Sequence, residues 1–234
     1  MKLKRLSIAL AALGMGLAAS AHALVLMPGS GPLAVDVISA APGGSLLAQR
    51  SETVTTPHWS GTFRTAVVDG PEAGVNLDFY YQISNASGSQ DALGRLTGSD
   101  FANAFTTKLQ QTNAAVNLTG AGSVGALSFV AGNQQALSGD RGNLGVVGFN
   151  FLPGSNGSGK VDPGESSYTL IVRTNATSFT NGTTAITNGT ASNVQSFMPS
   201  GSPPVVGPIP EPGTLALLAS GLLAAGGVAR RRSR

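Results

Sequence analysis

Apolar and polar side chains alternate over residues 75–84. One face of this segment carries Val75, Leu77, Phe79, Tyr81 and Ile83, and the other carries Asn76, Asp78, Tyr80, Gln82 and Ser84. Successive side chains of a strand point to opposite sides of a sheet, so a period of two predicts a half-buried β-strand.

Four further segments repeat this character less cleanly: 62–68, 124–130, 144–152 and 168–174. Each contains β-branched or aromatic residues and is bounded by Gly, Pro, Asn or Asp. Asn-Gly pairs beginning at residues 156, 181 and 188 supply left-handed turn residues suited to tight hairpins. Many short strands without a sustained helical period predict an antiparallel β-sandwich, immunoglobulin-like or jelly-roll-like.

Two other segments of this body are harder to assign. Residues 98–111 place Phe101, Phe105 and Leu109 four positions apart, which fits a helix and equally a strand with a bulge. Between the last two Asn-Gly pairs we expect a short strand over 183–187 with a turn on each side. The body is expected to end near Phe197, the last aromatic residue of the chain.

The N-terminus has the three parts of a secretory leader. Met1 to Arg5 carries three positive charges, an apolar stretch follows, and small residues occupy Ala21 and Ala23, the two positions that a signal peptidase inspects. We therefore expect a signal helix within residues 1–23, export through the Sec translocon, and cleavage before Leu24. The apolar stretch is shorter than the roughly 20 residues of a membrane-spanning helix, which argues against an uncleaved anchor.

A second apolar segment lies near the C-terminus. Residues 213–229 are uncharged, and four arginines follow: Arg230, Arg231, Arg232 and Arg234. Seventeen helical residues reach roughly 25 Å, which is enough to span a thin bilayer, and the arginines mark the cytoplasmic side as a stop signal. Pro210, Glu211 and Pro212 precede this segment, after a Pro/Gly-rich linker over 200–209. The expected folded body is therefore residues 24–199.

This tail resembles a PEP-CTERM sorting signal, in which Pro210, Glu211 and Pro212 would be the recognition motif of an exosortase. The resemblance implies a Gram-negative source and passage through the inner membrane. Processing near the motif and transfer to the cell surface or the extracellular matrix would follow. It further implies an association with exopolysaccharide and biofilm. A plain single-span anchor is the alternative, but such an anchor needs no Pro-acid-Pro sequence at its outer border.

The distribution of charge argues against nucleic-acid binding. The chain has a formal net charge of +3 and a pI of about 9.6. Half of its 14 basic residues, however, lie at the two extreme ends. Residues 24–209 hold seven basic and ten acidic side chains, a net charge of −3, so no basic stripe for phosphates is expected. The absence of cysteine excludes disulfides, thiolate metal sites and a thiol nucleophile.

Candidate ligand chemistry is sparse. Tyr80 lies opposite Phe79 and Tyr81, so an exposed Tyr80 would be able to stack on a sugar ring in a carbohydrate-binding module. The alternative, which we favour, is a second buried face of the sheet. Asp162 and Glu165 offer carboxylates to a calcium ion in a Gly-rich loop, but they lack the alternating acids of an EF-hand. We favour a solvated turn, and therefore no metal.

A Ser-His-Asp triad would have to use His58, because cleavage of the leader removes His22, the other histidine. His58 lies in Thr-Pro-His-Trp, without a nucleophile-elbow sequence in a strand-turn-helix setting. A secreted hydrolase is therefore the least favoured of three hypotheses, behind a carbohydrate-binding module. We expect a non-enzymatic surface or matrix protein without a cofactor.

Overall fold

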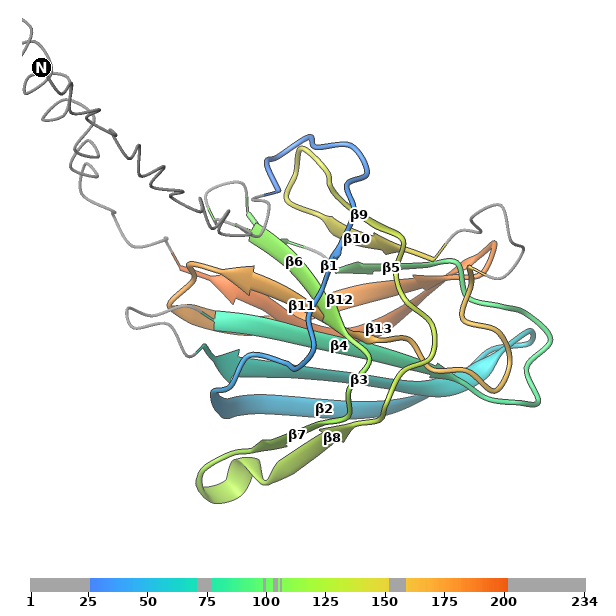
Figure 1. Ribbon diagram of the computed structural model, residues 1–234, viewed down its shortest axis with the longest axis horizontal. Coiled ribbons are helices and arrows are strands. Elements are labelled where there is room, and N and C mark those ends of the chain that lie inside the picture. Colours follow the sequence, from blue (N-terminus) through green and yellow to red (C-terminus); the bar gives the residue numbers. More distant parts are fainter. Residues whose placement is uncertain are drawn as a thin grey trace, which may run out of the picture.

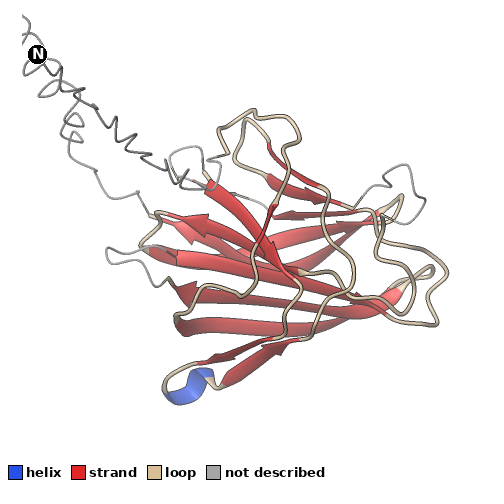
Figure 2. Cartoon of the chain, viewed as in Figure 1, coloured by secondary structure: helices blue, strands red, loops and turns tan. Residues whose placement is uncertain are grey.

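The protein is mainly β, as the alternating pattern predicts (Figures 1 and 2). A computed structural model describes residues 26–70, 77–98, 100–102, 105, 107–151 and 159–201. Within these ranges the strands are joined by turns and loops. The helical structure there is one short 3₁₀-helix, η1, over Gly122–Val124.

Two sheets form the body (Figure 1). The first has six strands, in the order β1 (Asp36–Val37), β6 (Thr107–Thr112), β11 (Thr169–Thr174), β4 (Leu77–Asn85), β3 (Ser60–Asp69) and β2 (Ser45–Thr55). The second has five, in the order β13 (Ala191–Ser200), β12 (Ser178–Thr187), β5 (Arg95–Gly98), β10 (Val147–Asn150) and β9 (Ser138–Arg141). All neighbouring strands in these two sheets run antiparallel, except β1 and β6, which run parallel.

The main core lies between the two sheets and uses one face of each. The first sheet contributes Phe63, Phe79, Tyr81, Ile83 and Leu170, and the second contributes Leu96, Phe149, Ile186 and Val194. Aromatic rings pack edge to face within this core, with 5.3 Å between the ring centres of Phe79 and Phe101. The apolar face predicted for 75–84 is thus the inner face of β4, as far as the described residues reach.

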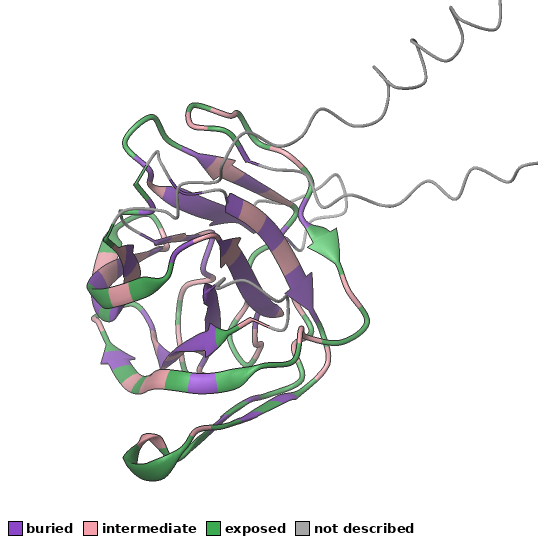
Figure 3. Cartoon of the chain, turned by 90° about the vertical axis from the view of Figure 1, so that its left-hand side faces the viewer, coloured by how far each residue is buried: buried purple, intermediate pink, exposed green. Residues whose placement is uncertain are grey.

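The other face of β4 is also buried, so the prediction of a half-buried strand is wrong. A small hairpin, β7 (Val116–Thr119) with β8 (Ala126–Phe129), lies beneath the first sheet in Figure 1 and covers part of its outer face. Alternate side chains of this hairpin pack with outward-facing residues of the sheet: Val116, Leu118, Leu127 and Phe129 with Leu46, Ala66, Val68, Tyr80 and Ile171. Figure 3 shows buried residues along these strands.

The strands predicted at 62–68 and 168–174 are confirmed as β3 and β11, with shifted ends. Those predicted at 124–130 and 144–152 are present but shorter, as β8 and β10. The helix alternative for 98–111 is wrong for the described residues, because β6 occupies Thr107–Thr112. In an extended strand, Thr107, Leu109 and Gln111 share one face and are buried.

The turn predicted at Asn181-Gly182 is wrong, because both residues lie inside β12, which begins at Ser178. Gly182 lacks a side chain where a Cβ would come within 2.9 Å of the Cβ of Met198 on β13, so glycine fits the close strand approach. Asn188-Gly189 does form the turn between β12 and β13, and Gly189 has φ 110°. The pair Asn156-Gly157 lies outside the described residues.

Candidate functional site

Tyr80 is buried, so the less favoured hypothesis, an exposed ring that stacks on a sugar, is wrong. Its exposed fraction is 0%, and its hydroxyl donates a hydrogen bond of 2.8 Å to the carbonyl oxygen of Pro42. The ring packs against Phe129 of β8, with 6.0 Å between ring centres. Burial raises the pKa of the phenol, as expected where water is excluded. The favoured alternative, a covered second face of the sheet, is confirmed.

None of the other aromatic residues is exposed. All thirteen lie in the described part of the chain, and none of them is exposed; Tyr168 and Phe179 are half-buried and the rest are buried. Sugar rings stack on exposed aromatic faces, and among the described aromatic residues the most accessible, Tyr168 and Phe179, are only half-buried.

His58 lies exposed in the turn between β2 and β3, beside the buried Trp59. Its backbone carbonyl accepts hydrogen bonds from the amides of Gln90 and Asp91, at 2.8 and 3.1 Å. Within the described residues, its imidazole makes no hydrogen bond to a hydroxyl or a carboxylate, the contacts that a catalytic triad requires. The histidine therefore connects two loops through its backbone.

Asp162 and Glu165 lie at the two ends of a turn that is closed by two hydrogen bonds. The amide of Glu165 donates to the carbonyl of Asp162, and Glu165 Oε2 accepts from the amide of Asp162, both at 3.0 Å. Gly164, with φ 89°, follows Pro163 in the pattern of a type II turn. Within the described ranges, no group of three or more His, Cys, Asp or Glu side chains lies close enough to hold a metal ion.

The second sheet carries a polar cluster that the sequence did not predict. Arg95 of β5 binds Asp140 of β9 through two parallel hydrogen bonds, Nη1 to Oδ2 at 2.6 Å and Nη2 to Oδ1 at 2.7 Å. Asn150 of β10 joins both, accepting from Arg95 and donating to Asp140 at 2.8 Å. A Cβ at Gly148 would lie 2.1 Å from Arg95 Nη2, so glycine at this position lets the arginine cross β10.

The cluster is suited to structure rather than to acid-base chemistry. Hydrogen bonding from Arg95 holds the pKa of the Asp140 carboxyl below its ordinary value. Near neutral pH this carboxylate is therefore ionised, and both of its oxygens accept hydrogen bonds from Arg95. Beside the cluster lies an open hollow of about 280 Å³, which Lys160 and Thr187 also line. Hydrogen bonds within the cluster and to Ser138 and Thr97 already use most of the polar atoms of Arg95 and Asn150.

Both terminal signals lie outside the described residues. These are the leader with Ala21, Ala23 and Leu24, and the tail with Pro210, Glu211, Pro212, Arg230, Arg231, Arg232 and Arg234. The predicted span over 213–229 lies there too. In the ranges that the structure describes, no helix has the length and apolar character needed to cross a bilayer. The structure does place the end of the body, because β13 ends at Ser200, which is hydrogen-bonded to Ser178 of β12.

Comparison with known proteins identifies the tail. Residues 208–233 match the model of the PEP-CTERM protein-sorting motif. The chain carries a PEP-CTERM sorting motif. The match includes Pro210, Glu211 and Pro212, the apolar segment and Arg230 to Arg232, so the resemblance seen in the sequence is confirmed. No curated protein and no solved structure matches the chain.

The PEP-CTERM motif implies the general route of the protein. It indicates a chain that is exported, sorted to the cell surface and processed by an exosortase. The motif follows β13 after a few residues, so the folded body is the cargo that this signal delivers.

Proposed function

We propose that the chain is the precursor of a non-enzymatic protein of the cell surface or extracellular matrix. Its leader is removed after Ala23, its C-terminal segment over 213–229 holds it transiently in the inner membrane, and an exosortase processes it near Glu211. The observation that carries this proposal is the PEP-CTERM motif at the end of a β-rich body. Association with exopolysaccharide and biofilm completes the proposed role.

Three features of the body support a passive role. Within the described residues, the imidazole of His58 makes no hydrogen bond to a hydroxyl or a carboxylate. Asp140 is neutralised by Arg95, and the Glu165 carboxylate closes its own turn. A protein of this kind would act through its fold and its location, without a dedicated catalytic residue.

We also infer that the body is a jelly-roll-like β-sandwich rather than an immunoglobulin-like one. The nested pairing supports this: β4 pairs with β11, and β5 pairs with β10. β6 then lies on the other side of β11, and β9 lies on the other side of β10. Strands that leave in one order and return in the reverse order, distributed over two sheets, are the arrangement of a jelly roll.

The sorting step is tested by replacing Pro210, Glu211 and Pro212 together with alanine in the native host. The matched control replaces Pro203 and Pro204 in the linker, which also removes prolines but leaves the motif intact. Membrane, polysaccharide matrix and medium are then separated and probed for the body. We expect the wild type and the control to reach the matrix or medium in a shortened form, and the motif variant to stay in the membrane at full length.

Two results would count against the proposal. Equal release of the motif variant would show that the motif is not used for sorting. Release of the wild type into the medium, with the same yield in a strain that makes no exopolysaccharide, would remove the polysaccharide association and leave the sorting route intact.

A further inference from the structure

The first described residues of the chain cross the side of the body where β6 and β9 lie. We call residues 26–38 the N-terminal strap. Its first amide, that of Leu26, donates to Thr107 at the start of β6, at 2.7 Å. Leu33 then exchanges two hydrogen bonds with Gly139 of β9, each 2.8 Å long. Asp36 and Val37 form β1 beside β6, so the strap pairs with one edge strand of the second sheet and with β6 of the first.

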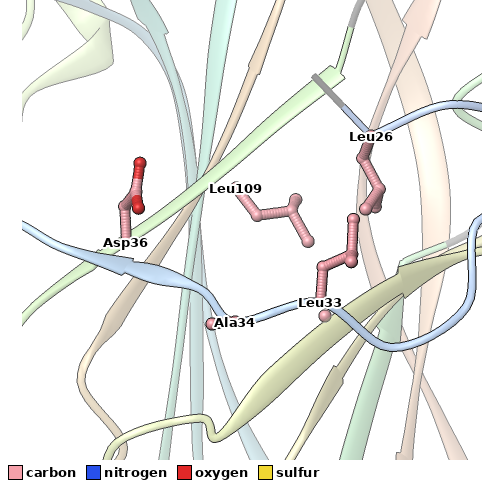
Figure 4. Close-up of a pocket in the computed structure, with 6 residues that line it drawn as sticks. Leu26, Leu33, Ala34, Asp36 and Leu109 are labelled. Atoms are coloured by element: carbon pink, nitrogen blue, oxygen red, sulfur yellow. The ribbon is translucent and has the colours of Figure 1, made fainter. Parts of the chain in front are cut away.

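Apolar side chains of the strap fill the space beneath it. Figure 4 shows Leu26 and Leu33 pointing toward Leu109 of β6, whereas Asp36 points away from them. Leu26, Val35 and Leu109 are buried members of the main core, and Leu33 packs against that core. The remaining pocket between them measures only about 10 Å³, so the strap fits closely. It therefore completes the core on this side.

One buried cation holds the strap in place. Arg141, the last residue of β9, is 2% exposed and donates from Nη1 to the carbonyl of Leu26 at 3.0 Å. Its other guanidinium hydrogen bonds reach the connection between β5 and β6: the carbonyls of Phe105, Phe101 and Ala102, at 2.8 to 2.9 Å. The guanidinium thus joins the strap to that connection.

The buried charge of Arg141 is hydrogen-bonded to neutral groups. Its four acceptors are backbone carbonyls, and within the described residues no carboxylate pairs with it. Burial accordingly lowers its pKa, and Nε has no hydrogen-bond partner among the described atoms. Opening the strap would return the cation to water, which offsets part of the hydrogen bonding and apolar contact that is lost.

We propose that the strap is a latch, closed by Arg141, that opens as a unit while the rest of the body stays folded. In the closed state it covers the edge of β9 and lies beside β6. In the open state both strands have unpaired backbone groups. Segments with such local opening have lower opening free energies than the strands of the core.

Native-state hydrogen exchange on the processed wild-type protein tests the latch. The reporters are the amides of Leu26, Leu33 and Ile38, which donate to Thr107, Gly139 and Gln111. We expect these three amides to exchange together, at least about ten-fold faster than the amides of β3 and β4, and with a weaker dependence on urea. Exchange of all these amides through one global unfolding event would overturn the proposal.

Variants assign the closing role to Arg141. Arg141→Met leaves four carbonyls without their donor, so exchange at the three strap amides should accelerate at least about ten-fold relative to β3 and β4. Arg141→Lys, with fewer donors, should lie between it and the wild type. Arg50→Met is the control. Arg50 lies on β2 and contacts the ring of Phe197, so its replacement should leave exchange at the strap amides unchanged. Equal acceleration everywhere, or none at the strap, would contradict the assignment.

Discussion

At the scale of single residues, two polar side chains on the outer face of β4 are buried and hydrogen-bonded to loops that lie far away in the sequence. Gln82 of β4, with an exposed fraction of 0%, donates to the carbonyls of Val130 and Ser167 and accepts from the amide of Val130. Tyr80, on the same face, uses Pro42 in the same way. Buried polar groups that keep their hydrogen bonds are compatible with a stable core.

Removing the hydroxyl of Tyr80 should therefore destabilise the fold. Tyr80→Phe loses the bond to Pro42, and we expect the free energy of unfolding to fall by about 1 kcal/mol. Urea denaturation measures the change. Tyr168→Phe, at a half-buried position, is the control and should change stability by less than about 0.5 kcal/mol. Equal effects of the two substitutions would show that the bond to Pro42 contributes nothing.

The Arg95 and Asp140 pair should make stability depend on pH in the acid range. The pKa of Asp140 is lowered in the folded state from an ordinary value of 3.8, so the pair stabilises above about pH 4 and is lost as the pH falls below it. The side chains are 32% and 19% exposed, so solvent screening limits the effect to about 1 kcal/mol.

Asp140→Asn is the test of this pH dependence. The variant should be less stable than the wild type at pH 7, and the difference should shrink between pH 4 and pH 2. Asp69→Asn, at an exposed end of β3, is the control for loss of a surface carboxylate. A stability difference that stays constant from pH 7 to pH 2 would contradict the assigned role of the ion pair.

At the scale of elements, the β7 and β8 hairpin decides which surfaces are accessible. It is a separate two-stranded sheet that turns the outer face of β4 into a second apolar cluster. Phe129 is the largest side chain that it contributes, and it is 1% exposed. The hairpin therefore covers Tyr80, the one tyrosine that the sequence suggested as a stacking surface.

Truncating Phe129 should uncover this face. We expect Phe129→Ala to lower the free energy of unfolding by about 3 kcal/mol, because a large buried ring is lost and a cavity remains. Phe179→Ala on β12 removes a half-buried ring and should cost less than half as much. Urea denaturation of both variants gives the comparison; a smaller cost at Phe129 would show that the hairpin is not part of the cooperative core.

The alternating pattern was sufficient to predict which residues form the inner face of β4. That face carries Leu77, Phe79, Tyr81 and Ile83, which all lie in the main core. It was insufficient for the outer face, because β7 and β8 have only four residues each and carry two inward side chains apiece. A strand was predicted at 124–130, where β8 lies, but the four residues of β7 do not stand out in a chain rich in Gly, Ser and Thr, so the covering hairpin was not predicted. The burial of Tyr80 thus depends on a contact between distant segments.

The polar groups of the body show the same limit. Arg95 and Asp140 lie 45 residues apart and come from different strands, so no local spacing announces their contact. Arg141 and Leu26 are 115 residues apart. By contrast, the sorting motif is contiguous, and its three parts were recognisable in order along the chain. The contiguous sorting motif was therefore recognisable from the sequence, whereas contacts between residues far apart in the chain were not.

At the scale of the whole molecule, the chain combines a β-rich body with a C-terminal sorting signal. The body ends with β13, and the PEP-CTERM motif follows at 208–233. Two sheets and a covering hairpin leave a surface of loops and turns without an exposed aromatic ring in the part that the structure describes. The central claim is that the segments outside the body direct its export and are removed on the way.

The intact mass of the protein, isolated from the membrane and from the medium of its native host, tests this claim most directly. We predict a mature species that begins at Leu24 and ends near Glu211, between Pro210 and Pro212, found outside the inner membrane. A chain that ends at Arg234 and stays in the membrane would contradict exosortase processing and would make the protein a simple anchored one.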